Sequence, residues 1–256
     1  MITPDVTPEL LPAGRSLRRV PKASDLFAAD IRQRILQGRL TPGSRLAPEA
    51  ELIAEFGLSR TTVREGLRLL EVEGLIRVKR GPNGGIEVAR PNEERVTSAL
   101  GVLLQFEQAP LSLLLEAREI LEPPCAALAA TRATSKHIET LTAATDDMAA
   151  AEPGSAQYHQ SNLRFHVGLA EAAGNEVLRI FLASMRELVE MSTRKINFDQ
   201  RQLRYGIRAH RKIIKAIHDR DPIAASELTL QHVSTFEHWL EKRAASTIPV
   251  SLRESR

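Results

Sequence analysis

The stretch Ser59-Arg-Thr-Thr-Val-Arg-Glu-Gly-Leu-Arg-Leu-Leu-Glu-Val-Glu-Gly74 decides the fold of the N-terminal third of the chain. Ser59 is a favourable N-cap residue, and Val63, Leu67 and Leu70 follow at the i, i+4, i+7 spacing of one helix face. The stretch therefore predicts an amphipathic helix that ends at Gly74. The polar and charged residues that lie away from its apolar stripe are Arg60, Thr61, Arg64 and Arg68.

Two helical patterns come before this helix, and a strand pattern follows it. Residues 24–37 and 48–56 repeat apolar side chains at helical spacing. Residues 75–79 and 86–88 are typical of strands, and the Gly-rich segment 81–85 between them is typical of a turn. Three helices followed by a β-hairpin predict a winged helix-turn-helix.

This order of elements favours DNA binding, because the third helix can enter a major groove with its N-terminal end near the bases. Arginine can bind guanine through two hydrogen bonds, and hydroxyl groups and helix N-terminal amides suit phosphate oxygens. The candidate contacts are Ser59, Arg60, Thr61, Thr62 and Arg64 on the helix, Gly84 and Gly85 at the wing tip, and Lys79 and Arg80 beside it. From these residues alone, a winged helix that contacts proteins instead of DNA stays open.

Composition and charge limit the class of protein. The 256 residues, 43% apolar and 26% charged, suffice for two globular domains. No apolar run approaches the roughly 20 residues that span a bilayer, and the N-terminus lacks the apolar segment of a signal peptide, so we expect a cytoplasmic protein without membrane contact. Residues 1–95 carry 16 Lys and Arg against 13 Asp and Glu, whereas residues 96–256 carry 19 of each. The positive excess therefore falls in the part predicted to bind DNA.

The remainder of the chain shows helical spacing throughout and predicts an antiparallel helical bundle. The expected helices are Val96–Gln108, Leu111–Thr131, Lys136–Ala151, Gln157–Ala173, Glu176–Phe198, Arg201–Arg220 and Pro222–Ala244. Pro123 and Pro124 should kink the second of these or divide it in two. The expected organisation is a flexible arm at 1–23, a winged helix at 24–91, a helical domain at 96–245 and a flexible tail at 246–256.

Four side chains in the helical part form a candidate metal site. Asn162 and His166 are four residues apart on one helix, and His210 and His232 lie on later helices. Three imidazoles and an amide oxygen suit a borderline divalent ion such as zinc. The single cysteine, Cys125, excludes a site built on several thiolates. For any one of the seven histidines, a surface or hydrogen-bonded core position remains the alternative from the residues alone.

Three motifs of the N-terminal third stand out, namely Leu40-Thr-Pro-Gly-Ser-Arg-Leu46, Leu58-Ser-Arg-Thr-Thr-Val-Arg-Glu65 and Leu67-Arg-Leu-Leu-Glu-Val-Glu-Gly-Leu75. In these motifs the chain resembles the GntR family of bacterial transcription regulators. The resemblance implies that the operator-contacting residues are Arg60, Thr61, Thr62 and Arg64, with Gly84 and Gly85 at the wing tip. Many members have an arginine where this chain has Ala50, so one familiar DNA contact is missing.

The helical part resembles the FCD domain, the effector-binding bundle of the FadR branch of the same family. In its metal-binding members, an Asp or Asn, a His four residues later and two further His hold a divalent cation, which implies Asn162, His166, His210 and His232 as ligands here. Zinc is the expected metal, with nickel or manganese as alternatives. Asn162 replaces the commoner Asp and removes a negative charge, which should weaken the hold on hard cations. The four remaining histidines, His137, His159, His218 and His238, match no ligand position.

Arg118 is the candidate effector contact. The resemblance implies that an arginine at this place in the first bundle helix faces the pocket, where a guanidinium and a cation would favour a small carboxylate-bearing metabolite. A salt bridge to Glu122, four residues on, is an equal alternative for Arg118. Arg164 is a weaker candidate, because it lies two residues from His166 and so faces elsewhere.

The function expected from these features is that of a homodimeric repressor, released from a pseudo-palindromic double-stranded operator when a carboxylate binds the bundle. A metal-dependent enzyme whose winged helix makes protein contacts is the alternative class. It finds little support, because no catalytic base, nucleophile motif or phosphate loop accompanies the histidines. An adaptor with a degenerate winged helix is a third possibility, against which Arg60 and Arg64 argue.

Overall fold

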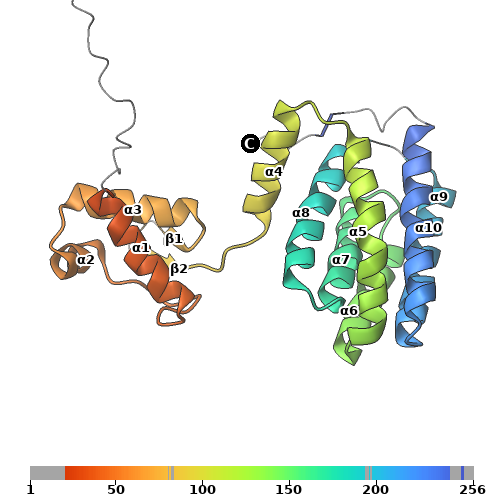
Figure 1. Cartoon of the computed structure of the whole chain (residues 1–256), viewed down its shortest axis with the longest axis horizontal. Helices are drawn as coiled ribbons and strands as arrows, with labels where there is room; N and C mark the ends of the chain where they lie inside the picture. The colour runs from red at the N-terminus through yellow and green to blue at the C-terminus, as the bar shows by residue number, and fades with distance from the viewer. Residues whose placement is uncertain are drawn as a thin grey trace, which may run out of the picture. The chain divides into compact units, whose positions relative to one another are not determined.

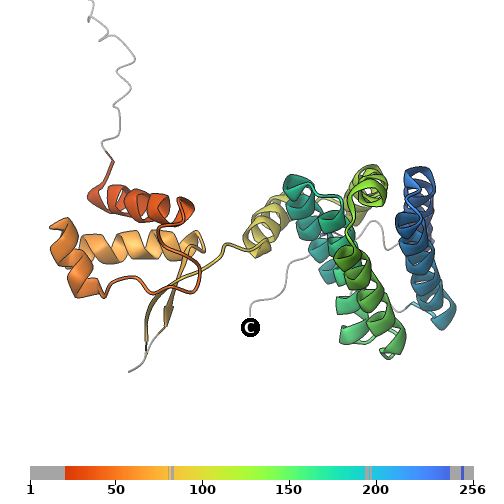
Figure 2. The same cartoon turned by 90° about the horizontal axis from the view of Figure 1, so that it is seen from below.

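The computed structural model describes residues 21–79, 81, 84–193, 196, 198–242 and 249–250, and it divides between Asn92 and Glu93 into two compact units (Figure 1). Three helices and a two-stranded sheet form the first unit. Its elements are α1 (Ala23–Leu36), α2 (Glu49–Phe56), α3 (Arg60–Val72), β1 (Ile76–Lys79) and β2 (Gly85–Val88). The strands are antiparallel, with Ile76 opposite Val88 and Lys79 opposite Gly85, and Figure 2 shows them side by side as a hairpin. The predicted winged helix-turn-helix is confirmed.

The core of the first unit is held by a close approach of α1 and α3. Phe27 and Ile31 of α1 and Val63 and Leu70 of α3 are buried together. Gly66 makes this approach possible, because a Cβ atom there would lie 2.4 Å from the Phe27 ring. The apolar stripe of α3 is therefore fixed inward, and the opposite side of the helix faces solvent.

The second unit contains helices only, apart from one isolated β-bridge, among the residues that the structure describes. Its helices are α4 (Glu94–Phe106), α5 (Leu111–Arg132), α6 (Ser135–Ala150), α7 (Ala156–Ala172), α8 (Glu176–Thr193), α9 (Gln200–His218) and α10 (Pro222–Glu241). Helix α5 is central, since it packs against α7, α8, α9 and α10, as the colours of Figure 1 let the reader follow. The prediction of a helical bundle is confirmed.

Two expected features of these helices differ in the structure. Pro123 and Pro124 lie inside α5 without dividing it, so only the reading as one helix survives. Buried neighbours on both sides, Glu122 and Cys125, anchor the helix across this point, which offsets the hydrogen bonds that the two prolines remove. Helix α8 is described as far as Thr193, and the described residues Ile196 and Phe198 are not helical, so the predicted end at Phe198 is wrong.

Several predicted features fall at or beyond the limits of the description. The arm up to residue 20 and Arg80 lie outside the described residues. The predicted flexible tail is described only at Pro249 and Val250, where the Val250 amide donates to Ala109 O and the Val250 side chain is buried, contrary to that expectation. No helix of the described part is long and apolar enough to cross a membrane.

Candidate DNA interface and candidate metal centre

The N-terminal end of α3 presents polar side chains to solvent. The Ser59 hydroxyl accepts a hydrogen bond from the Thr62 amide at 3.2 Å, so Ser59 is the N-cap that the sequence predicts. The Ser59 and Thr62 hydroxyl oxygens are 2.8 Å apart. This cap fixes the first turn of α3 and orients its free backbone amides outward, as anion binding at a helix N-terminus requires.

The arginines of this surface are exposed and weakly paired. Arg60 and Arg64 retain 76% and 70% of their side-chain exposure. Both guanidinium Nε atoms approach Glu49 of α2, at 3.8 and 3.9 Å, which is too far for a hydrogen bond. Ion pairs between one carboxylate and two solvated arginines contribute little to stability. A phosphate or a base edge can therefore replace Glu49 as the partner of these arginines at a small cost in free energy.

A concave surface connects α3 with the wing. It is lined by basic, polar and acidic side chains of α3, by Arg45 and Glu49, and by the start of β2. The candidate DNA contacts among its lining residues are Arg60, Thr61, Arg64, Gly84 and Gly85. The structure therefore brings five predicted contacts of the helix and wing to one surface, whereas Ser59 and Thr62 are not among its lining residues. Lys79 instead forms an ion pair with Glu87 across the hairpin.

In the second unit, three histidines from three helices meet in the interior. His166 of α7, His210 of α9 and His232 of α10 are buried, and each offers a nitrogen such that the three atoms lie within 4.8 Å of one another. The Nε2 atoms of His210 and His232 are 3.2 Å apart. The Phe165 ring stacks on His210 with 3.6 Å between centroids. These positions would allow all three imidazoles to bind the same divalent cation through nitrogen.

Burial keeps these imidazoles neutral. Loss of water contact lowers the pKa of His166 to about 4, and the positive charge of Arg186 adds to this against the opposing effect of Glu122. Burial also holds the pKa values of His210 and His232 well below the usual range. A neutral imidazole has the lone pair that a metal ion needs, so the triad is ready to bind a cation at neutral pH.

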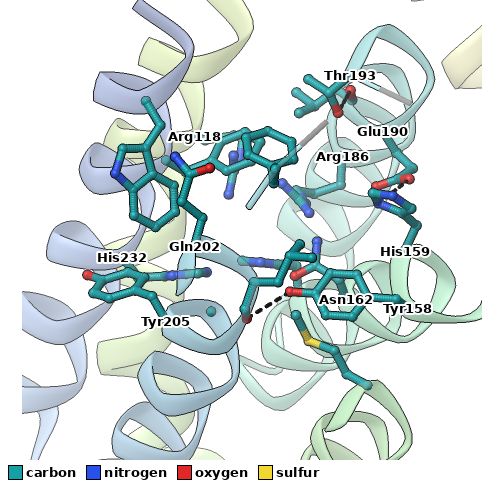
Figure 3. A pocket seen from close by; sticks show the side chains of 18 residues that line it. Arg118, Tyr158, His159, Asn162, Arg186, Glu190, Thr193, Gln202, Tyr205 and His232 are labelled. Carbon is teal, nitrogen blue, oxygen red and sulfur yellow. Dashed lines mark hydrogen bonds and ion pairs between the residues drawn. The ribbon is translucent and has the colours of Figure 1, made fainter. Parts of the chain in front are cut away.

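Asn162 lies one turn before His166 on α7 and lines the same pocket as His166 and His232 (Figure 3). His210 is not among the lining residues. The remaining wall is largely aromatic, with Tyr158, Phe198, Tyr205, Phe236 and Trp239. A pocket with apolar walls and a few polar groups is the usual form of a small-molecule site.

Arg118 forms the salt bridge that the sequence left open as an alternative, and it also lines the pocket. Its Nε atom donates to Glu122 Oε1 at 2.7 Å, which is the i, i+4 salt bridge, and both side chains are only 2% exposed. Arg118 also lines the pocket, and its Nη1 atom has no hydrogen-bond partner in the described part of the chain. The guanidinium is therefore anchored at one edge and available to a ligand at another. Arg164, the weaker candidate, is half exposed and pairs with Asp147.

Four charged or titratable residues at this pocket were not predicted as functional residues: Arg186, His159 and Glu190 line it, and Glu122 lies beside it. Arg186 of α8 is buried and lines the pocket, and its Nε atom lacks a partner among the described residues. Burial and the neighbouring Arg118 lower the pKa of Arg186 to about 9. His159 Nδ1 lies 3.1 Å from Glu190 Oε1, and Figure 3 shows this pair at the edge of the pocket. Glu122 Oε2 is 2.8 Å from His166 Nδ1, inside the cluster.

Spacing alone could have indicated two of these residues, Arg186 and His159. Arg186 falls on the buried stripe of α8 together with Leu182 and Val189, and a charged residue at such a position is unusual. His159 lies on the same face of α7 as Asn162 and His166.

These features together define a class of protein. A winged helix-turn-helix with exposed arginines is joined in one chain to a helical domain that holds a buried polar pocket. This combination is that of a ligand-responsive DNA-binding transcription regulator.

Comparison with known proteins agrees with this class. Residues 24–88 match the family described as "Bacterial regulatory proteins, gntR family", and residues 113–235 match the FCD domain. The transcriptional repressor NanR of Klebsiella aerogenes is 30% identical over 87% of this chain and 88% of its own length. The galactonate operon transcriptional repressor of Escherichia coli is 29% identical over 83% and 94%. A solved structure, GntR of Streptococcus agalactiae, has a TM-score of 0.66 and 25% identity over 84% of this chain and 99% of that one.

The chain belongs to the GntR family of bacterial transcription regulators, in the FadR-type branch that carries an FCD domain. The resemblance found in the sequence is thereby confirmed. The protein is a transcription regulator and not a metal-dependent enzyme, since the family and the relatives above are regulators.

Proposed function

We propose that the protein is a homodimeric repressor whose helical domain holds a divalent cation and a small carboxylate effector, and which leaves a pseudo-palindromic operator when the effector binds. The DNA contacts in this proposal are Ser59, Arg60, Thr61, Thr62, Arg64, Gly84 and Gly85. The cation ligands are Asn162, His166, His210 and His232, with zinc first and nickel or manganese as alternatives. Arg118 binds the effector.

The single observation that carries the metal part of this proposal is the buried triad of neutral imidazoles. Each buried ring offers a nitrogen, and the three nitrogens lie within 4.8 Å of one another, so a cation bound between them would stabilise polar atoms that are shielded from water. A zinc ion with nitrogen ligands fits this donor set. The Asn162 amide oxygen completes it without adding a negative charge.

The anionic effector is supported by the charge of the pocket. Arg118 and Arg186 both line it, both are buried, and each has a guanidinium nitrogen without a hydrogen-bond partner among the described residues. Two buried guanidinium groups repel each other, and a carboxylate between them would relieve this repulsion. The relative named for the galactonate operon is consistent with an effector of this kind.

Homodimer formation is supported by apolar side chains on the surface of the second unit. Val102, Leu103 and Phe106 of α4 are exposed, as are Val177 and Phe181 of α8, and α4 packs against α8. A second copy of the chain could cover these side chains, and two winged helices would then meet two half-sites.

The test is elemental analysis of tag-free protein by mass spectrometry, applied to wild type, His166→Ala and His210→Ala. Near-stoichiometric zinc, nickel or manganese is expected in wild type and should be lost in both variants. His218→Ala is the matched control, because His218 is exposed on α9 and should not affect metal content. Metal-free wild type that gains no metal on incubation with zinc would contradict the proposal.

A further inference from the structure

Glu122 joins the candidate metal ligands to the candidate effector contact. One carboxylate oxygen, Oε1, accepts the hydrogen bond of Arg118 Nε at 2.7 Å. The other, Oε2, lies 2.8 Å from His166 Nδ1. All three side chains are buried, so water does not compete for these contacts. A single carboxylate therefore links α5 to α7 at the centre of the site.

The contact with Glu122 sets the tautomer of His166. An ionised carboxylate offers acceptor atoms only, so His166 Nδ1 carries the proton and donates it to Oε2. The lone pair is then on Nε2, which is the atom left to bind a cation. A carboxylate behind a metal-binding histidine orients the ring and raises the basicity of its free nitrogen.

The other two histidines lack such a partner among the described residues. Their Nε2 atoms are 3.2 Å apart, a distance that fits one proton shared between them, and their Nδ1 atoms are buried without hydrogen bonds. One of these rings must move its proton to Nδ1 before both Nε2 atoms can face a cation. Of the three ligands, His166 is thus the one held in its binding form beforehand.

We propose that Glu122 is the positioning residue of this site, fixing His166 for the cation and Arg118 for the effector through the two oxygens of one carboxylate. The inference rests on the proposed metal site. It adds that the cation and the anion are coupled through Glu122, because a ligand that draws Arg118 away changes the charge that Glu122 presents to His166. By thermodynamic linkage, each ligand then changes the affinity of the other by the same factor.

The experiment measures zinc affinity of the full chain by competition with a chromogenic chelator, and the absorption spectrum of the cobalt(II) form. Glu122→Leu removes both hydrogen bonds and should weaken zinc binding by about 100-fold, whereas Glu122→Gln keeps an acceptor oxygen near His166 and should weaken it by about tenfold. The partial rescue by Gln, and a changed cobalt spectrum in that variant, are effects that a merely structural role would not produce. Glu116→Gln, on the exposed side of α5, is the matched control and should bind as wild type does.

The outcomes separate the two proposals. Circular dichroism identifies a variant that fails to fold, and if Glu122→Leu does so, Glu122→Gln carries the test. If Glu122→Gln folds and keeps wild-type zinc affinity and a wild-type cobalt spectrum, the positioning role of Glu122 is overturned, whereas the proposed metal site stands. Wild-type protein that binds neither zinc nor cobalt would overturn the metal site and this inference with it.

Discussion

The two units of the chain place their arginines in opposite environments. Arg60 and Arg64 of the winged helix stand in water, more than two-thirds exposed, against a single carboxylate. Arg118 and Arg186 of the helical domain are almost fully buried and face a pocket. This difference fits the two proposed roles: the exposed arginines would meet the large, salt-screened charge of a DNA backbone, whereas the buried ones would act strongly on one small anion.

The largest effect that we expect from this difference between exposed and buried arginines is on DNA binding. Replacing Arg60 and Arg64 together by Ala should weaken binding by about 2–6 kcal/mol, roughly 30-fold to 10⁴-fold, because each arginine can supply a bidentate base contact. The measurement is an electrophoretic mobility shift with a DNA fragment that wild-type protein selects from a random library.

A basic side chain of the helical domain, Lys215, provides the control for this double variant. Lys215 is exposed on α9, so Lys215→Ala changes the net charge in the same direction without touching the first unit. It should bind the selected fragment as wild type does. An Arg60, Arg64 double variant that also binds normally would remove α3 as the recognition helix.

Acid should destabilise the helical domain once metal has been removed with a chelator. The pKa of His166 falls from 6.5 in the unfolded chain to about 4 in the folded one, so protons bind the unfolded chain preferentially between these values. The contribution of neutral His166 to the free energy of unfolding is fully present above pH 6.5 and is lost as the pH falls through 4. We expect this loss to be about 3 kcal/mol from His166 alone. The charged and titratable groups around this ring are Arg118, Glu122, Arg186, His210 and His232.

Urea unfolding of the chelated protein at a series of pH values measures this loss. Saturating zinc should move the loss to lower pH, since the bound cation competes with the proton. Stability that is constant from pH 7 to pH 4.5 in the chelated protein would contradict the buried, neutral triad.

Packing gives a third test, because each unit contains a buried helical glycine. Gly66→Ala in α3 forces a Cβ atom to within 2.4 Å of the Phe27 ring and 2.9 Å of the Ser24 carbonyl oxygen, and should destabilise the winged helix by about 1–3 kcal/mol. Gly168→Ala in α7 meets only the Leu141 side chain, at 3.3 Å, and should cost less. Calorimetric melting of both variants checks the order, and an equal effect would show that α1 and α3 can move apart.

The smallest expected effect compares two helix caps. Ser59 caps α3 and Ser155 caps α7, each by accepting a hydrogen bond from a backbone amide at 3.2 Å. Each change to Ala should cost about 1 kcal/mol of stability. Only Ser59→Ala should also weaken DNA binding in the mobility shift, since Ser59 lies at the end of α3 that we propose contacts DNA. Equal DNA binding by the two variants would leave Ser59 with a structural role alone.

The sequence predicted the first unit nearly completely, because its signals are local. The signals for the N-cap Ser59, the apolar stripe of α3 and the two strands each act over a few residues, and the structure has these features where the pattern indicates. The histidine triad was predicted as a set by family resemblance, and the structure brings its three side chains together. The assignment of all four residues as ligands, Asn162 included, stays a prediction.

The rest of the pocket depends on contacts between distant helices, which periodicity does not specify. Glu122 reads in the sequence as a partner for Arg118 at i+4, and nothing local indicates that its second oxygen reaches His166, 44 residues away. His159 and Glu190 meet across α7 and α8 in the same way. Pro123 and Pro124 are a different case. Their local effect on the backbone predicted a kink or a division of the helix, but tertiary packing keeps α5 as one helix.

In the proposed function, the ligand state of the buried pocket controls the DNA affinity of the exposed surface. The most direct test is fluorescence anisotropy of the selected DNA fragment with zinc-loaded protein, titrated with a panel of sugar acids and dicarboxylates. We expect at least one carboxylate to weaken DNA binding by about 5–150-fold, and Arg118→Ala to abolish this response. A carboxylate that binds the wild-type pocket, as calorimetry would show, and yet leaves DNA affinity unchanged would contradict this control of DNA binding by the pocket.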